Sequence, residues 1–139
     1  MNYYLIKSEP NEYSINDLQS DGTTEWDGVR NYQAVSYIKE WTPGDRLYIY
    51  HSGKERTIVG LAHVESESYP DPNDDRSWIA KITFDAILNA DTQISLKTIK
   101  AQDNLQDFAL VRQPRLSVMP CPDTFVTWMQ EQGIIWPSE

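Results

Sequence analysis

The sequence is poor in several features that many functional classes need. Its 139 residues include one cysteine, Cys121, so no internal disulfide can form and a reducing compartment is the simpler expectation. No run approaches the roughly 20 apolar residues that cross a bilayer. The N-terminus also lacks the basic start and long apolar core of a signal peptide. We therefore expect a cytoplasmic protein without membrane contact.

Residues that commonly hold metals or carry catalysis are also scarce. The two histidines, His51 and His63, are not spaced as a metal-ligand pair, and Cys121 stands between two prolines with nothing nearby to lower its pKa. The glycines form neither a phosphate-binding loop nor a dinucleotide fingerprint, and no nucleophile elbow is present. From this scarcity we predict no metal site, no cofactor and no enzymatic activity.

Positive charge is the third shortage. Twelve Lys and Arg face twenty-one Asp and Glu, which gives a net charge of -9. A protein that holds duplex DNA through its phosphates usually carries a basic patch or a high pI. Net charge does not exclude a local cationic mouth, for which Arg30, Arg112 and Arg115 are the candidates. The excess of negative charge favours a base, a nucleotide or a short strand as the ligand over a long nucleic acid.

Aromatic residues, in contrast, are plentiful. Five Trp and eight Tyr stand against three Phe, and the first two combine an apolar face with a polar handle. Such side chains suit pocket walls as well as cores. The length fits one domain over residues 1–139, and neither a repeat nor a linker divides it.

The chain mixes strand and helix signals. Ser14 and Asp17 are spaced as a capping box, and Asn31 is a good cap for a second helix. Loops are expected at residues 23–29 and 69–75. Strands are predicted at residues 3–7, 46–50, 57–67, 77–88 and 115–118, and helices at 15–19, from 31 onward, at 94–101 and after 123. This order predicts an α+β fold with a small open barrel of five or six strands and surrounding helices.

Four segments combine aromatic and polar residues in a way that neither a core nor a plain surface requires. They offer stacking faces, hydroxyls, an amide and guanidinium groups, which together suit a nucleobase. The segments are residues 7–10, 26–31, 50–52 and 112–117.

Each of these residues also has a simpler explanation. Trp26 fits a core as well as a pocket wall, and Asn31 is explained as a helix cap. His51 alone is typical of a structural histidine, Ser52 can begin a turn, and Arg115 can pair with a surface carboxylate. Taken one at a time, the residues do not establish a site.

A resemblance joins the segments. The matching blocks are residues 4–10 (YLIKSEP), 13–18, 26–34 (WDGVRNYQA), 44–45, 50–52, 58–60, 69–72 and 110–118. In this order they resemble the EVE domain family, and the chain looks like a stand-alone bacterial member. The resemblance implies a PUA-like fold, which is a curved β-barrel of five to six strands with helices around it.

The wider group includes the YTH domains, which hold N6-methyladenine in RNA, and domains that read modified cytosine in DNA. The resemblance therefore implies a non-catalytic module that binds a modified base of DNA or RNA, flipped out or single-stranded, between aromatic walls. The implied pocket residues are Ser8, Trp26, Gly28, Val29, Asn31, Tyr32, His51, Ser52, Tyr69 and Ser117. The residues expected to meet phosphates are Lys7, Arg30, Arg112 and Arg115.

Two alternatives stay open. The net charge of -9 is compatible with a small non-nucleic ligand on the same fold. An enzyme acting on modified nucleotides would use His51 and Ser52. The sequence leaves the oligomeric state open, with a monomer favoured.

Overall fold

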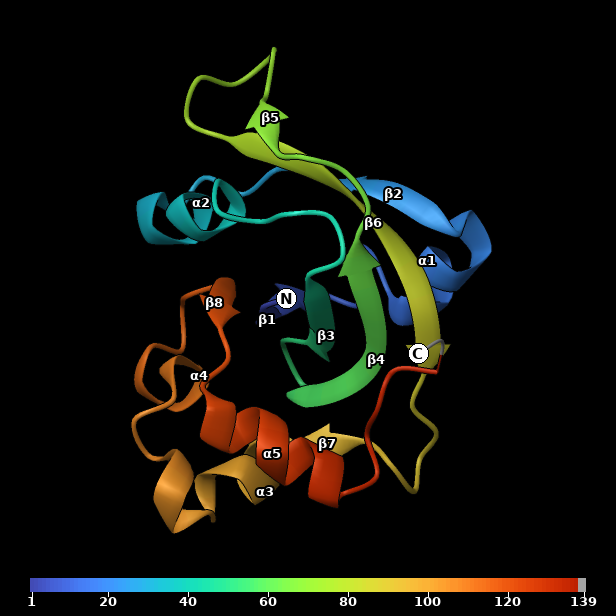
Figure 1. The fold of residues 1–139 in the computed structure, drawn as a ribbon, viewed down its shortest axis with the longest axis vertical. Coiled ribbons are helices and arrows are strands. Elements are labelled where there is room, and N and C mark those ends of the chain that lie inside the picture. The colour runs from blue at the N-terminus through green and yellow to red at the C-terminus, as the bar shows by residue number, and fades with distance from the viewer. Residues whose placement is uncertain (138–139) are drawn as a thin grey trace.

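A curved mixed sheet forms the centre of the molecule in the computed structural model, which describes residues 1–137 (Figure 1). Its strand order is β2-β6-β4-β3-β1-β8, with β5 paired to β6 and β7 paired to β4. Among the strand pairs within residues 1–137, only β1–β3 is parallel. The strands are β1 (Tyr3–Ser8), β2 (Thr23–Trp26), β3 (Arg46–His51), β4 (Thr57–Val64), β5 (Tyr69–Pro70), β6 (Trp78–Ile87), β7 (Ile94–Ser95) and β8 (Val118–Pro120).

The helices lie around this sheet. They are α1 (Ile15–Asp21), α2 (Tyr32–Ile38), α3 (Leu96–Lys100), η1 (Asp103–Leu105), α4 (Ala109–Arg112) and α5 (Asp123–Glu131). The capping box predicted for α1 is present, because Asp17 N donates to Ser14 Oγ and Ser14 N donates to Asp17 Oδ2. Within residues 1–137, no helix is long and apolar enough to cross a membrane.

The sheet curves strongly but does not close. Its two end strands, β2 and β8, do not pair with each other. Helix α2 packs against both β8 and β6, so it crosses the opening between the two ends of the sheet (Figure 1). The α+β class and the curved sheet are confirmed, and the sheet has eight strands, of which β5 and β7 are two residues long.

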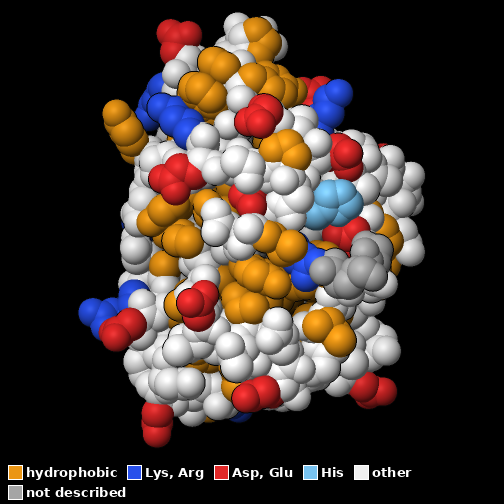
Figure 2. Space-filling view, viewed as in Figure 1, with side chains coloured by type: hydrophobic (Ala, Val, Ile, Leu, Met, Phe, Trp, Pro, Cys, Tyr) orange, Lys and Arg blue, Asp and Glu red, His pale blue; other side chains and the backbone are white. Residues whose placement is uncertain are grey.

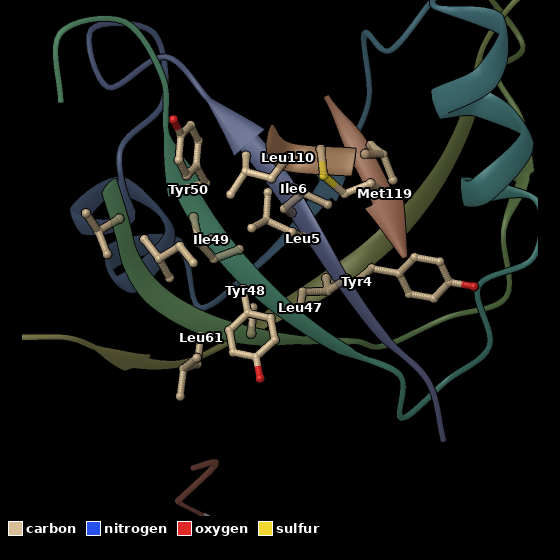
Figure 3. Close-up of a cluster of buried hydrophobic side chains, with 14 of the residues drawn as sticks. Tyr4, Leu5, Ile6, Leu47, Tyr48, Ile49, Tyr50, Leu61, Leu110 and Met119 are labelled. Carbon is tan, nitrogen blue, oxygen red and sulfur yellow. The ribbon is translucent and has the colours of Figure 1, made fainter. Parts of the chain in front are cut away.

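The main core lies where β1 and β3 run side by side. All six residues of β3 are buried, which is typical of a central strand covered on both faces. Figure 3 shows Leu5 and Ile6 of β1 beside Tyr48 and Ile49 of β3. The C-terminal segment is tied to this core by Trp136, whose Nε1 donates to the carbonyl of Ala62 over 2.9 Å.

Three local predictions are wrong. Residues 23–29 were expected to form a loop, but residues 23–26 are strand β2, which pairs antiparallel with β6. Residues 69–75 were also expected to be a loop, and their first two residues pair with β6 as β5. The last strand covers Val118–Pro120 instead of 115–118, because its partners on β1 are Tyr4, Leu5 and Ile6.

Candidate functional site

A cleft of about 680 Å³ opens between the two unpaired ends of the sheet, and we call it the first cleft. The end of β1, the segment before α1, strand β2, the following loop and the residue before β8 all contribute to its wall. The lining residues are Lys7, Ser8, Glu9, Glu12, Tyr13, Thr24, Glu25, Trp26, Asp27, Gly28, Val29, Arg30 and Ser117. Because an open sheet leaves its edge strands apart, the cleft is a consequence of the missing β2–β8 pairing.

Two aromatic rings form a corner of the first cleft. Trp26 and Tyr13 lie with their centroids 6.2 Å apart and their planes at 75°, an edge-to-face arrangement. The hydroxyl of Tyr13 donates to Asp21 Oδ2 over 2.6 Å, and the hydroxyl of Ser8 donates to the backbone carbonyl of Tyr13. Burial, followed by the hydrogen bond to Asp21, raises the pKa of Tyr13 to about 12. At physiological pH Tyr13 is therefore neutral, and its hydrogen bond to Asp21 fixes the ring on the wall of the cleft.

Carboxylates dominate the polar part of this lining. Glu9, Glu12, Glu25 and Asp27 face only two cations, Lys7 and Arg30. None of these four acids, nor Tyr13, was among the predicted pocket residues, although Glu9 and Asp27 lie within the segments 7–10 and 26–31. Two signals pointed to Tyr13: it begins the block of residues 13–18 that resembles the EVE domain family, and it stands directly before the cap Ser14, which fixes the start of α1.

Glu25 is held by a residue from outside the first cleft. Tyr69, on β5, donates its hydroxyl to Glu25 Oε2 over 2.6 Å. This hydrogen bond is the main reason that the pKa of Tyr69 is raised to about 12. Tyr69 was predicted to line the pocket. In the structure Glu25 lines the first cleft, and Tyr69 contacts Glu25 from outside the lining.

Lys7 and Arg30 differ in how they are held. The Lys7 ammonium donates to the carbonyl of Pro114 over 2.9 Å and lies 5.5 Å from the centroid of the Tyr50 ring. Burial lowers the pKa of Lys7. Arg30 is exposed at the cleft edge and pairs with Asp74 over 3.0 Å. Both cations line the first cleft, and their predicted contact with phosphates stays a prediction.

Asn31 and Arg115 are placed differently from Trp26. Asn31 caps α2, because its Oδ1 accepts from Ala34 N over 2.9 Å. Asn31 and Arg115 line a separate hollow of about 310 Å³ and not the first cleft. Arg112 lies on α4 and pairs with Asp107 over 3.3 Å, also outside the first cleft.

His51 and Ser52 do not line the first cleft either. His51 is 5% exposed, and its Nε2 accepts from the backbone N–H of Ile15 over 3.0 Å. Its Nδ1 lies 2.8 Å from Glu55 Oε1. An Nε2 that accepts a backbone N–H carries no proton, so the ring is the neutral tautomer protonated at Nδ1. His51 thus joins β3 to the start of α1.

The loop of residues 27–31 turns sharply after β2. Gly28 has a φ of +76°, a left-handed conformation that favours glycine, and it lies on the cleft wall with Val29. Gly28, Val29 and Ser117 are thus brought together with Ser8 and Trp26 in one cleft. Tyr32 lies on the other side of this loop, in a second cleft. Within residues 1–137, no group of three or more His, Cys, Asp or Glu residues is placed to hold a metal ion.

The open curved sheet, with a cleft between its end strands, places the chain among PUA-like α+β domains. The EVE domain family matches residues 2–132, so the chain belongs to the EVE domain family. Rat thymocyte nuclear protein 1 is 44% identical over 82 residues, which cover 50% of this chain and 36% of that protein. The zebrafish (Danio rerio) protein of the same name is 30% identical over 151 residues, covering 84% of this chain and 65% of its own length. The matches therefore cover less than two thirds of these relatives.

Solved structures agree over nearly the whole chain. Protein Atu2648 from Agrobacterium tumefaciens has a TM-score of 0.89 at 32% identity, covering 100% of this chain and 98% of that one. The human THYN1 protein in complex with 5-methylcytosine-containing DNA has a TM-score of 0.85 at 25% identity, covering 97% and 99%. The fold is therefore shared with a protein that has been solved with modified DNA.

Proposed function

We propose that the first cleft binds a modified nucleobase extruded from a nucleic-acid strand, and that the domain recognises the base without catalysing a reaction. The observation that carries this proposal is the corner formed by Trp26 and Tyr13 inside the cleft of about 680 Å³. That volume lies within the range of about 300–1,000 Å³ that is common for small-molecule sites. The DNA complex of the related human THYN1 protein supports the same class of ligand.

The aromatic corner supplies affinity. Stacking of one base on an aromatic ring contributes about 1–3 kcal/mol and tolerates any base. A flat base that stacks on Trp26 would meet the edge or face of Tyr13 at the observed 75°. Binding from a duplex also costs a few kcal/mol of unstacking, so a single strand or a mismatched site is favoured.

The acidic lining supplies discrimination. Carboxylates accept hydrogen bonds from exocyclic amino groups, as Glu and Asp do with cytosine N4. Glu9, Glu25 and Asp27 thus favour cytosine-type or adenine-type bases over thymine or uracil, which lack an amino group. A buried methyl group adds about 0.8 kcal/mol, so selectivity for a methylated base also depends on a close fit.

The placement of His51 supports binding without turnover. Both of its ring nitrogens are engaged, with Ile15 N and with Glu55, so neither is free to act as a base toward a ligand in the first cleft. Ser52 donates its backbone N–H to the Ser8 carbonyl and lies outside the lining. The enzymatic alternative through these two residues therefore has no geometric support.

A free modified nucleoside is the second candidate ligand. The four carboxylates of the first cleft favour it, because they repel a phosphate more than they repel an uncharged nucleoside. A ligand series from nucleoside to nucleotide to trinucleotide separates the two candidates. Affinity that rises with strand length supports recognition within a strand, and affinity that falls at the first phosphate supports the free nucleoside.

The test is calorimetric titration with trinucleotides that carry 5-methylcytosine, N6-methyladenine or the unmodified base at the centre. We expect tighter binding of at least one modified strand, and a loss of about tenfold in affinity for Trp26→Ala from the lost stack. Trp26→Phe keeps most of the affinity, and Trp128→Ala, on α5, serves as the control for loss of a tryptophan. Equal affinity of Trp26→Ala and the wild type would overturn the proposal.

A further inference from the structure

A second cleft of about 460 Å³ lies on the other side of the loop of residues 27–31. Helix α2 and the turn before β6 form its walls. Arg30 lines both clefts, so the two hollows meet at this residue. Figure 2 shows Lys and Arg side chains next to hydrophobic ones at the top left of the molecule, over α2 and the neighbouring β5 and β6.

The two clefts have opposite charge. In the part of the chain that the structure describes, four carboxylates and two cations line the first cleft, whereas Arg30, Lys39 and Arg76 line the second with Asp75 as the only acid. Among residues 1–137, only Arg30 of these three cations forms an ion pair, with Asp74. A chain with a net charge of -9 thus gathers three of its twelve cations at one hollow, which indicates an anionic ligand there.

Two aromatic side chains lie among these cations. The Lys39 ammonium lies 5.2 Å from the centroid of the Trp78 ring, close enough for a cation–π contact. Tyr32 is 89% exposed, although a tyrosine is large enough to gain from burial. Cations interleaved with accessible aromatic rings are typical of surfaces that follow a single nucleic-acid strand.

We propose that the second cleft binds the nucleotide that neighbours the extruded base in the same strand. The base of this flanking nucleotide stacks on Tyr32, and its phosphates contact Lys39 and Arg76. The phosphodiester that joins the two nucleotides passes Arg30, which gives up part of its pairing with Asp74. This inference rests on the proposed function of the first cleft, and it explains how an acidic domain can hold a charged strand.

The experiment measures binding of a modified nucleoside and of trinucleotides with the modified base at the 5′ end, the centre or the 3′ end. Deoxyribose and ribose backbones are compared as separate arms. We expect a trinucleotide to bind more tightly than the nucleoside, with one of the two flanks responsible. Tyr32→Ala then lowers trinucleotide affinity by about tenfold, through loss of one stacked base, and Tyr32→Phe retains it.

The charge contribution is measured by salt dependence. The double variant Lys39→Ala, Arg76→Ala should reduce the slope of log K against log salt by about 1.4, since each phosphate contact on a single strand contributes about 0.7. The charge-matched control is Lys97→Ala, Lys100→Ala on α3, which Figure 1 places at the opposite end of the molecule from β5. Nucleoside affinity should be unchanged in all four variants.

The outcomes separate the two proposals. If trinucleotides depend on Trp26 but are unaffected by the Tyr32 and Lys39/Arg76 variants, the flanking site is wrong and the base site stands. If those variants weaken nucleoside and trinucleotide equally, the second cleft does not hold a flanking nucleotide. If neither ligand binds, or binding does not depend on Trp26, both proposals fall.

Discussion

The two clefts on either side of residues 27–31 are built in different ways. The first is bounded by strands, and hydrogen bonds from Ser8 and Tyr69 hold parts of its wall. The second lies between a two-turn helix and a turn, and one of its two aromatic rings, Tyr32, is almost fully exposed. Their charges are opposite. Net charge is therefore a poor guide to ligand type when a fold separates acidic from cationic residues over a short distance.

Gly60, in β4, is the position where we expect a substitution to have the largest effect. A Cβ at this position would lie 2.3 Å from Ile15 Cδ1 and 2.9 Å from the carbonyl oxygen of Ala86. Gly60→Ala should therefore lower the free energy of unfolding by about 1–3 kcal/mol, as overpacking of a core does. It should also shift α1, and with it Tyr13, so the first cleft is disturbed. Chemical denaturation and nucleobase titration measure the two effects.

A second substitution provides the control. Ile15→Ala in the Gly60→Ala background removes the side-chain clash but leaves the one with the Ala86 carbonyl. The double variant should regain only part of the free energy of unfolding that Gly60→Ala loses. Relief of the clash with Ile15 stabilises it, but truncation of a buried isoleucine destabilises it. A Gly60→Ala protein as stable as the wild type would show that α1 is not fitted closely to β4.

A substitution at Asn31 tests whether the start of α2 supports the second cleft. Asn31→Ala removes the side-chain acceptor of Ala34 N at the start of α2, which should lower the free energy of unfolding by about 1 kcal/mol. The start of α2 should fray, which weakens the proposed flanking site more than the base site. Hydrogen exchange at Ala34 measures the fraying, and Asn31→Asp, which keeps the oxygen, should behave like the wild type. Unchanged exchange at Ala34 would contradict the capping role.

The smallest expected effect concerns Tyr69 and Glu25. The hydrogen bond raises the pKa of Tyr69 from 10.0 to about 12. Since the folded-state pKa lies above the unfolded one, the stability that this pair contributes is fully present below pH 10 and is lost as the pH rises to about 12. Ultraviolet titration of the phenols should show that Glu25→Gln lowers the pKa of Tyr69.

Tyr13 is the internal control for that titration. Its pKa is also raised to about 12, but mainly by burial, so it should still ionise late in Glu25→Gln. Tyr69→Phe identifies which step of the titration belongs to Tyr69. A titration curve identical in the wild type and Glu25→Gln would show that the hydroxyl and the carboxylate do not interact in solution.

Only some of the predicted site residues lie together in the first cleft. The structure brings Lys7, Ser8, Trp26, Gly28, Val29, Arg30 and Ser117 to the first cleft. Asn31 and Tyr32 follow the same loop but face other hollows. His51 is buried against α1. The four carboxylates were missed because each one, taken alone, is an ordinary surface acid. Only the meeting of β1, β2 and their loops makes them a lining.

Local features could be predicted from residues that are close together in the chain. Ser14 with Asp17, and Asn31, predicted where α1 and α2 begin, because a helix cap is a hydrogen bond between residues three apart. Tertiary structure alone decided β2 and the position of β8. Strand β2 alternates only between exposed and half-buried residues and has Trp26 as its single apolar side chain, so its sequence carries no apolar alternation, and its pairing with β6 makes it a strand. The first cleft also depends on tertiary structure, because it lies where strands distant in sequence end without a partner.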